Sequence, residues 1–364
     1  MNKNMYMDLH VLQTLPPSCV NRDDTGSPKT AYYGGVMRAR VSSQAWKRAM
    51  RMDFKEIFSA DQIGYRTKNT VKLVAEEIKR NNKEIQPEKA EEMAKNILEL
   101  AGVKPEEGKK DVLFFISTKQ VEAIARLAEE YASSTKKSKD EYKKKAKQVL
   151  KDNPSIDILL FGRMAASAPE LNYDAAAQVA HSISTHAVST EYDYFTAVDD
   201  FGEEDNMGAG HLGTVEFNSS TMYRYATVNL SELAKYLTEE ELKLTAKEFT
   251  KAFVISMPTG KQNTFANRTL PDLVYVTMRN DQPINLVGAF EKPISADNSG
   301  YVEKSKNELF NYAHDVYQDY VSEPVSAWII GGKDDFPGEK VNLTELLEGI
   351  ENAVAEYSDR TVGE

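Results

Sequence analysis

Apolar residues near the start of the chain mark a short strand followed by an amphipathic helix. Residues 5–12 have the length and residue types of a strand, and a loop rich in Pro, Asn, Asp and Gly follows them. Beyond the loop, Trp46, Ala49 and Met50 recur at helical spacing. This pattern predicts a helix whose apolar stripe faces the core.

From about residue 59 the pattern changes to helical spacing in a composition dominated by Ala, Glu, Lys and Leu. We therefore expect a helical subdomain, residues 59–152, inserted between core segments 1–58 and 153–364. Its last helix, residues 136–151, carries eight lysines and two acidic residues. Such a charge run is most often a solvated helix face.

After the insertion, strand and helix patterns surround a long hairpin. Two β-like arms around an acidic, Gly-rich tip predict this hairpin over about residues 186–220. Elsewhere we expect strands at 156–161, 223–230 and 273–278, and helices at 174–184, from 231, at 307–321 and at 343–357. Without the insertion, this order is compatible with an α+β fold, a ferredoxin-like or RNA-recognition-motif core elaborated by insertions.

Composition places the chain among soluble globular proteins. It has 364 residues, 41% of them hydrophobic and 28% charged, enough for one large domain or two ordinary ones. Its apolar runs are too short to cross a bilayer and no signal-peptide pattern opens it, so we expect a cytoplasmic protein. The single cysteine, Cys19, excludes an internal disulfide and a cysteine-based metal cluster.

One segment is basic although the chain as a whole is acidic. The formal net charge is −11, yet residues 38–51 contain five basic residues and no acidic one. A helix capped at Ser42 or Ser43 would point free backbone N–H groups and its positive dipole end at an anion. Its polar side would carry Gln44, Lys47, Arg48 and Arg51. That arrangement suits a polyphosphate backbone, and a merely solvated cationic helix face explains the segment equally well.

Catalytic motifs have little support in the sequence. The five histidines lack metal-binding spacing, and His181 and His186 are more typical of structural residues. Adjacent carboxylates at 23–24, 199–200 and 334–335 could bind a divalent metal, but such pairs are common in turns. We therefore expect no catalytic residue, no metal and no cofactor.

Nucleic-acid binding has broader support. Isolated basic or amide side chains occur in or near predicted loops, at Arg22, Lys29, Arg163, Lys261, Gln262 and Lys292. Four further side chains could contact unstacked bases, namely Met164, Phe195, Thr196 and Leu212. Taken singly, each of these apolar residues is more typical of core packing. The short RNP1 octapeptide is absent, so we do not expect bases to stack on an open sheet face.

Several segments together resemble one known family. Segments 8–12, 17–24, 34–35 and 40–51 are similar to the backbone subunit of the type I-E CRISPR surveillance complex, Cascade (the CasC family). Further similar segments follow in the family's order, at 162–165, 180–186, 193–200, 211–214, 217, 223–226 and 289–292. The resemblance covers most of the chain and is weakest in the helical insertion and after about residue 294.

The resemblance implies a hand-like protein with an elaborated RNA-recognition-motif palm, helical fingers and a β-hairpin thumb. Copies of such subunits polymerise along one CRISPR guide RNA, kink it at regular intervals and present it for pairing with target DNA in antiviral defence. The family's subunit is not a nuclease. Its partners are further copies of itself, the large and small Cascade subunits, the 5′-handle-binding subunit and the guide-processing endonuclease, with no membrane.

The resemblance also implies roles for particular residues. Guide phosphates would be held by Arg22, Lys29, Arg40, Ser42, Gln44, Lys47, Arg48 and Arg51, with Arg163, Lys261, Gln262 and Lys292 as further RNA contacts. The kinked nucleotide would be bracketed by Met164, Phe195, Thr196 and Leu212. Target DNA would meet the lysine-rich helix at Lys143, Lys144, Lys147 and Lys151. The acidic thumb tip, residues 202–210, departs from a phosphate-binding role.

Two other functions stay open. The first is a metal-dependent ribonuclease of a related CRISPR effector, with Asp23 or Asp24 as the candidate catalytic residue. The second is a structural oligomer whose basic helix binds an acidic partner protein.

Overall fold

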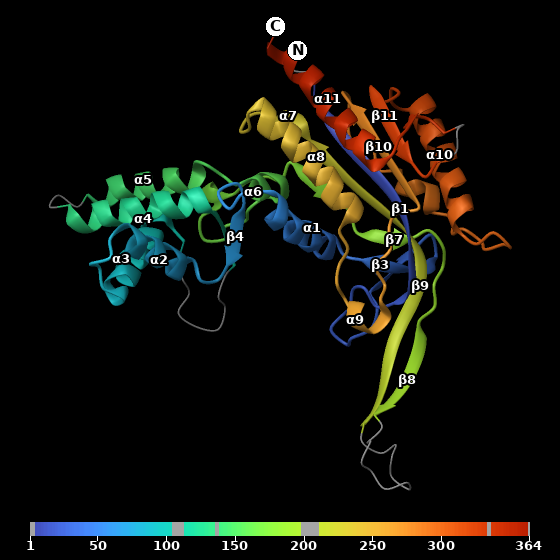
Figure 1. Cartoon of the computed structure of the whole chain (residues 1–364), viewed down its shortest axis with the longest axis horizontal. Helices are drawn as coiled ribbons and strands as arrows, with labels where there is room; N and C mark the ends of the chain where they lie inside the picture. The colour runs from blue at the N-terminus through green and yellow to red at the C-terminus, as the bar shows by residue number, and fades with distance from the viewer. Residues whose placement is uncertain (1–3, 104–112, 135–137, 198–210, 333–335, 363–364) are drawn as a thin grey trace. The chain divides into compact units, whose positions relative to one another are not determined.

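The structure, a computed structural model, describes residues 4–103, 113–134, 138–197, 211–332 and 336–362. The chain forms two compact units (Figure 1). The first unit comprises Met1–Asp53 and Gln178–Glu364, and the second comprises Phe54–Ala177. Among the helices that the structure describes, none is long and apolar enough to span a membrane.

The first unit is built on one large sheet with helices on both faces. Its strands are β1 (Tyr6–Ser18), β2 (Thr30–Tyr33), β3 (Val36–Val41), β6 (Ala177–Val179), β7 (Ser182–Ser184), β8 (Glu191–Ala197), β9 (His211–Asn229), β10 (Leu273–Arg279), β11 (Ser326–Ile330) and β12 (Glu339–Lys340). Its helices are α1 (Ser43–Ile57, which ends in the second unit), α7 (Leu230–Leu233), α8 (Glu239–Ile255), α9 (Gln262–Phe265), α10 (Val302–Asp319) and α11 (Leu343–Val362), with a 3₁₀ turn η2 (Leu286–Phe290).

The sheet contains the expected ferredoxin-like core. Its strand order is β12-β11-β10-β1-β9-β7-β3-β2, and β6 and β8 also pair with β9. Along the chain, β1, α1, β7, β9, α8 and β10 follow one another as a β-α-β-β-α-β unit. In the sheet its four strands lie antiparallel in the order β10-β1-β9-β7, which is the order 4-1-3-2 of a ferredoxin-like fold. The second unit is inserted between α1 and β7, and the β2–β3 hairpin precedes α1. The α+β, RNA-recognition-motif-like fold is therefore confirmed.

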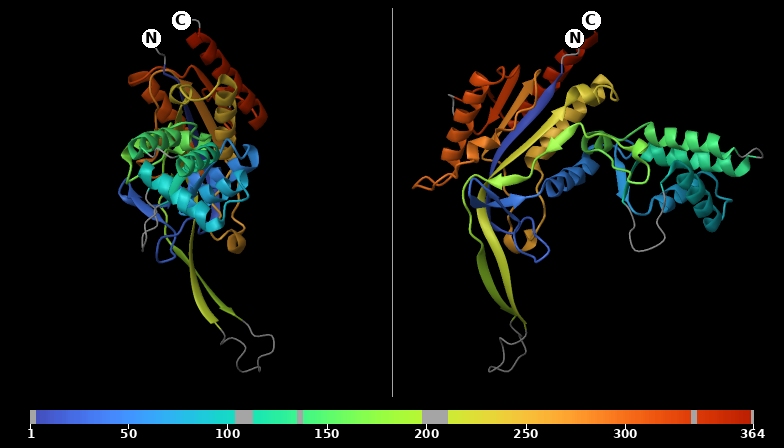
Figure 2. Two further views of the ribbon diagram at one scale, coloured as in Figure 1. Left: turned by 90° about the vertical axis from the view of Figure 1, so that its left-hand side faces the viewer. Right: turned by 180° about the vertical axis from the view of Figure 1, so that it is seen from behind.

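Strand β1 is buried on both faces, and its polar residues Asp8 and His10 are buried together with the apolar ones. On one face the Met7 sulfur accepts a hydrogen bond from the Thr250 hydroxyl of α8 at 3.5 Å, and on the other Leu12 belongs to a cluster completed by α10. Figures 1 and 2 show helices on both faces of the sheet. In that cluster the ring of Tyr275 meets Phe310 of α10 edge to face, 5.2 Å between centroids. Helix α10 thus closes the sheet face on which ordinary RNA-recognition motifs stack bases.

The thumb hairpin is formed by β8 and the first half of β9. The two strands pair from Glu191 with Phe217 to Ala197 with His211, and β9 then continues into the central sheet as far as Asn229. The predicted hairpin arm and the predicted strand at 223–230 are therefore one strand. Figures 1 and 2 show the hairpin extending beyond the ends of the other strands of the sheet. The acidic tip lies outside the described residues.

The second unit is mostly helical. It contains β4 (Gly64–Thr67), α2 (Thr70–Asn81), α3 (Pro87–Ala101), β5 (Phe114–Ser117), α4 (Thr118–Ser133), α5 (Lys139–Lys151), α6 (Ile156–Phe161) and η1 (Pro169–Leu171). Helix α4 begins with a capping box in which Ser117 and Gln120 bond each other's backbone N–H groups. Ile97, Ile116 and Ile124 are fully buried in its core.

Three expectations need correction. Residues 156–161 form helix α6 rather than a strand, because a segment of six residues is too short to reveal its period. Residues 174–184 form β6, β7 and loops rather than a helix, because pairing with β9 outweighs the helix propensity of alanine. The second unit also extends to Ala177 rather than ending at residue 152, and Leu171 is buried in its core.

Candidate nucleic-acid interface

Helix α1 is fixed by its N-terminal cap and by a buried tryptophan. The Ser42 hydroxyl accepts a hydrogen bond from the Ala45 N–H at 3.3 Å, while the Ser42 N–H donates to the Asn21 side chain at 2.9 Å. Trp46 is 1% exposed and its indole N–H donates to the Ser182 hydroxyl at 2.8 Å. The predicted cap and apolar stripe are thus confirmed.

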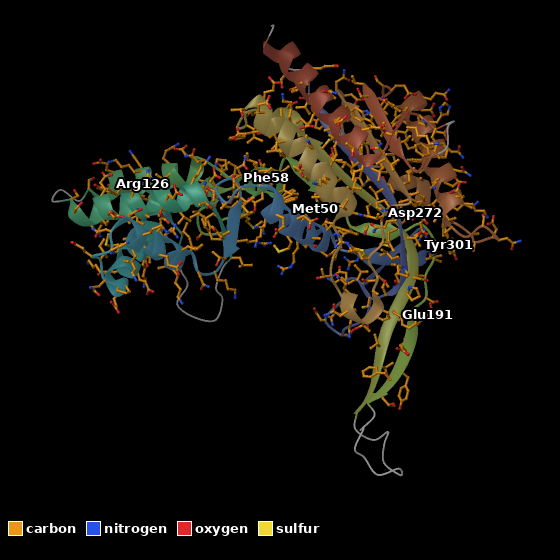
Figure 3. All side chains as sticks on the ribbon, in the orientation of Figure 1. Met50, Phe58, Arg126, Glu191, Asp272 and Tyr301 are labelled. Atoms are coloured by element: carbon orange, nitrogen blue, oxygen red, sulfur yellow. The ribbon has the colours of Figure 1, made fainter. Side chains whose placement is uncertain are left out.

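With that stripe buried, the opposite side of α1 carries the predicted polar residues. Gln44 and Arg48 are exposed, and Lys47 and Arg51 are partly exposed. Partial burial lowers the pKa of Lys47. Met50, labelled in Figure 3, is fully buried on the core side of the same helix.

A buried arginine anchors α1 to the sheet. The Arg224 guanidinium lies 3.7 Å from the centroid of the Trp46 ring and 4.6 Å from that of Phe253 on α8. It donates to the Gln13 side chain at 2.6 Å and to the Phe253 carbonyl. Burial lowers the pKa of Arg224 to about 9. The stacked cation fixes the direction in which α1 leaves the sheet.

The loop after β1 and the segment around α9 come together beside Cys19. Burial raises the pKa of the Cys19 thiol, and the nearby charges of Arg22 and Lys261 act against that rise. A Cβ at Gly260 would lie 2.0 Å from the Val20 carbonyl oxygen, so the two loops touch through their backbones. Lys261 holds a left-handed conformation at φ 49°, a strain found most often at functional sites. Arg22 and Lys261 are thereby neighbours despite their separation in sequence.

His181 joins this group of cations, although sequence spacing favoured a structural role for it. Its Nδ1 accepts hydrogen bonds from the Ser43 N–H and from the Arg40 guanidinium, each at 3.3 Å. Burial, followed by the charges of Arg40 and Lys29, lowers the pKa of His181. Because Nδ1 receives two donors, the proton of the neutral ring sits on Nε2, which makes the exposed ring a hydrogen-bond donor.

We call these residues the basic surface of the first unit: Arg22, Lys29, Arg40, Lys47, Arg48, Arg51, His181 and Lys261. They come from four separate chain segments that the fold brings together. Arg38 does not belong to it, because its guanidinium is buried and donates to the carbonyls of Ser184 at 2.9 Å and Phe290 at 2.8 Å. Gln262 and Lys292 are both exposed in the same unit.

The thumb hairpin carries the predicted apolar wedge residues in part. Phe195 is 41% exposed and its ring covers Gly213 on β9, where an added Cβ would lie 2.3 Å from the ring. Thr196 is exposed and pairs with Leu212, whose side chain lies outside the described residues. Glu191, labelled in Figure 3, begins β8 and makes the hairpin acidic rather than basic, together with Asp193 and Glu216.

Comparisons with known proteins identify the relatives of this arrangement. A family model described as CT1975-like protein matches residues 7–354. The chain belongs to this family. A chain of a solved "CRISPR RNA-guided surveillance complex, pre-nicking" is 31% identical with a TM-score of 0.81, covering 96% of this chain and 100% of that one. A chain of a second "CRISPR RNA-guided surveillance complex" is 27% identical with a TM-score of 0.73, covering 96% and 99%. The comparison with curated proteins found no match.

In this CT1975-like protein, Arg163 of the second unit is buried, although the sequence analysis expects it to contact RNA. Arg163 is 3% exposed, and it donates to the carbonyls of Leu171 at 2.9 Å and Leu150 at 2.7 Å. Burial lowers its pKa to about 10. The role predicted for Arg163 is therefore corrected from RNA contact to structural support. The neighbouring Met164 is 80% exposed, which a residue that contacts a ligand must be.

The lysine-rich helix α5 divides into paired and exposed cations. Lys147 forms an ion pair with Glu170, and Lys145 pairs with both Glu130 and Glu141. The remaining predicted DNA-binding residues of this helix, Lys143, Lys144 and Lys151, are exposed. Helix α5 buries Tyr142 and Leu150 on its other side, which fixes the direction of the exposed lysines.

Replacing Arg163 by lysine is expected to change RNA affinity by less than about twofold, because lysine keeps the positive charge and a side chain buried among backbone carbonyls does not reach a bound strand. Fluorescence anisotropy with a labelled guide RNA measures this. Met164→Ala is the matched control at the adjacent exposed position, where a larger loss is expected. A loss for Arg163→Lys that exceeds the loss for Met164→Ala would contradict the structural role.

Proposed function

We propose that this chain is a non-catalytic backbone subunit of a type I-E Cascade complex in the cytoplasm. It polymerises along a CRISPR guide RNA, holds the phosphates of the guide on its basic surface and presents the bases to target DNA. The observation that carries the proposal is the basic surface itself, gathered at the cap of α1 in a chain of net charge −11. Family membership and the similarity to surveillance-complex chains support it.

Two features of the first unit support recognition of the RNA backbone rather than its bases. Helix α10 covers the sheet face that would stack bases, so the accessible chemistry is that of cations and N–H donors. Contacts to phosphate position a strand without reading its sequence. A subunit that accepts any guide sequence needs this kind of contact. Neighbouring copies would repeat it along the strand, which makes assembly cooperative and sensitive to salt.

The test is to purify the chain expressed with a CRISPR array and to sequence any RNA that it retains. The proposal expects discrete guide-length RNA of repeat-spacer origin. If the chain alone is free of RNA, the purification is repeated with the other Cascade subunits. Absence of guide RNA from that larger assembly contradicts the proposal, and RNase-insensitive association with an acidic protein would favour the structural-oligomer alternative.

The ribonuclease alternative makes a separate expectation for the loop after β1. The Asp23 carboxylate accepts hydrogen bonds from the Thr25 N–H at 2.9 Å, the Thr25 hydroxyl at 2.7 Å and the Ser27 N–H at 3.0 Å. These bonds, the Thr25 hydroxyl first, lower the pKa of Asp23. This is the geometry of a turn-forming aspartate.

With Asp23 engaged in its turn, Asp24 is the catalytic candidate left to test. The non-catalytic proposal expects Asp24→Ala to leave both guide binding and the integrity of a paired target RNA unchanged. The measurement is gel analysis of labelled target RNA incubated with the assembled complex and Mg²⁺ or Mn²⁺. Cleavage by the wild type that disappears in Asp24→Ala would establish the ribonuclease instead.

A further inference from the structure

A bulge in the sheet opens a small hollow at the root of the thumb hairpin. Leu15 pairs with Ser220 and Ser18 with Asn218, so two residues of β1, both prolines, oppose the single residue Ser219 of β9. Prolines have no N–H group and cannot continue the ladder. The strands separate at this point, within the first unit.

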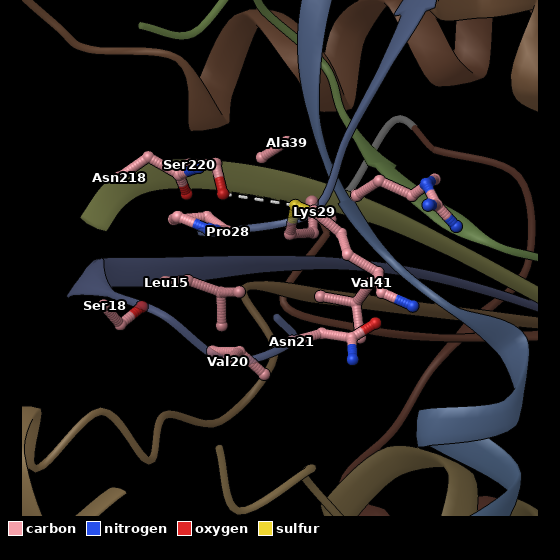
Figure 4. Close-up of a pocket in the computed structure, with 12 residues that line it drawn as sticks. Leu15, Ser18, Val20, Asn21, Pro28, Lys29, Ala39, Val41, Asn218 and Ser220 are labelled. Carbon is pink, nitrogen blue, oxygen red and sulfur yellow. Dashed lines mark hydrogen bonds between the residues drawn. The ribbon is translucent and has the colours of Figure 1, made fainter. Parts of the chain in front are cut away.

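Both apolar and polar side chains line the hollow (Figure 4). The apolar ones include Leu15, Val41 and Met222, and the polar ones include Lys29, Arg40, Asn218 and Ser220. Asn218, Ser220 and Met222 alternate along β9 and share one face of it. Two residues of the basic surface therefore border the same hollow as two small polar side chains.

Among the polar side chains that line the hollow, Asn218 has an amide nitrogen without a partner in the part of the chain that the structure describes. It is 8% exposed, and its amide nitrogen has no hydrogen-bond partner among the described residues. The other small polar groups are occupied: Ser18 donates to the Pro16 carbonyl, Ser220 to the Met222 sulfur at 3.2 Å and Asn21 accepts from Ser42. An unpaired buried amide costs about 1–3 kcal/mol, so its presence points to a ligand group.

The size of the hollow limits what that group can be. The volume of the hollow is about 20 Å³, counted as the space open to the centre of a water-sized group. One water molecule needs about 10–15 Å³ counted in the same way. A nucleobase is too large. A single hydroxyl fits, and because it both donates and accepts, it can pair with an asparagine amide in either orientation.

We infer that Asn218 recognises a ribose 2′-hydroxyl of the bound strand, next to a phosphate held by Lys29 and Arg40. This inference rests on the proposed function. The 2′-hydroxyl is the group that distinguishes RNA from DNA. Asn218 is thus a specificity-determining residue: phosphate contacts hold any strand, and the hollow favours the strand that carries hydroxyls.

The test compares the affinities of one single-stranded sequence made as RNA and as DNA. Asn218→Leu keeps the approximate volume of the side chain and removes the amide. We expect it to reduce the RNA-to-DNA preference about fivefold, the equivalent of one hydrogen bond, mainly by weakening RNA binding. Lys29→Ala is the matched control, expected to weaken both strands by similar factors because it removes only a phosphate contact.

The possible outcomes separate this inference from the proposed function. A preference that is unchanged in Asn218→Leu overturns the inference, and so does an equal loss for RNA and DNA, which would mean that Asn218 binds phosphate. Asn218→Ala, which also removes the amide, gives the same comparison if the leucine variant does not fold. A wild type that binds RNA and DNA equally overturns only the inference, whereas one that binds neither, alone or in the complex, overturns both.

Discussion

Replacing Lys47 and Arg51 together by alanine is expected to weaken guide-RNA binding by about 100-fold, since a charge-assisted hydrogen bond contributes about 1.5 kcal/mol. Both residues lie on the polar side of α1, and the cap at Ser42 and the burial of Trp46 fix the direction of that side. The substitutions leave those anchors untouched. The loss should therefore come from binding rather than folding.

The dependence of affinity on salt distinguishes a phosphate contact from a general charge effect. For a single strand, removing two phosphate contacts should reduce the slope of log K against log salt by about 1.4. The measurement is anisotropy titration between about 50 and 200 mM salt. Lys235→Ala/Lys304→Ala is the matched control, because it removes the same charge from exposed lysines that are ion-paired with Glu232 and Asp297. Equal slopes for the wild type and Lys47→Ala/Arg51→Ala would exclude α1 from the RNA interface.

The sequence predicts elements well where their periodicity is long and strong. Strand β1, helix α1 and the strand β10 all form where the hydrophobic pattern places them. Residues 156–161 do not, because six residues are too few to separate helical from strand spacing, and the order Ile156, Asp157, Ile158 imitates the alternation of a strand. The alanine-rich segment 174–184 fails for another reason, since its conformation is decided by distant partners on β9.

Exposure is the property that sequence reasoning cannot supply for arginine. Arg38, Arg163 and Arg224 occur next to residues of the predicted site, yet all three are buried and donate to backbone carbonyls. Each guanidinium donates hydrogen bonds to carbonyls at the end of a helix or loop, which require a donor. Nothing in their local sequence separates them from Arg40 or Arg48, which reach the surface.

The candidate site could be predicted within one helix but not between segments. Helical spacing places Lys47 and Arg51 on one side of α1 without any structure. The proximity of Lys261 to Arg22, and of His181 to Arg40, depends on loop contacts over more than a hundred residues. His181 in particular carries no spacing signal, because its role depends on the Ser43 N–H that orients its ring.

A second large effect is expected from the buried residues of β1 when the pH is changed. His10 stacks among Tyr223, Tyr225 and Tyr275 on the face closed by α10, and burial lowers its pKa to about 3. Asp8, two residues earlier, has a pKa raised to about 6, also by burial. The two groups act on stability with opposite signs.

The signs follow from proton linkage. The lowered pKa of His10 means that the unfolded chain takes up the proton first, so stability falls as pH decreases from 6.5 toward 3. The raised pKa of Asp8 means that the folded chain keeps its proton longer, so its contribution is present below about pH 4 and lost as pH rises through 6. Between pH 4 and 6 the two contributions largely cancel.

We therefore expect His10→Phe to expose the contribution of Asp8. Phenylalanine keeps a ring in the stack, and Tyr223 retains its hydrogen bond with the Leu286 N–H at 3.2 Å. Whatever the packing cost of the substitution, that cost is independent of pH. The difference in unfolding free energy between the wild type and the variant should fall by about 2.3 kcal/mol from pH 6.5 to 4.5. This is two pKa units at about 1.36 kcal/mol each, less about 0.4 kcal/mol because the histidine of the unfolded chain is already half protonated at pH 6.5.

Urea unfolding followed by tryptophan fluorescence measures this in the unit concerned, because the two tryptophans, Trp46 and Trp328, both lie in the first unit. His314→Gln, at an exposed position on α10, is the control and should keep the wild-type dependence on pH. Parallel profiles for the wild type and His10→Phe would mean that His10 keeps its ordinary pKa and is reached by water. In that case α10 would not close the sheet face, and the argument that RNA must bind at the basic surface would lose its structural basis.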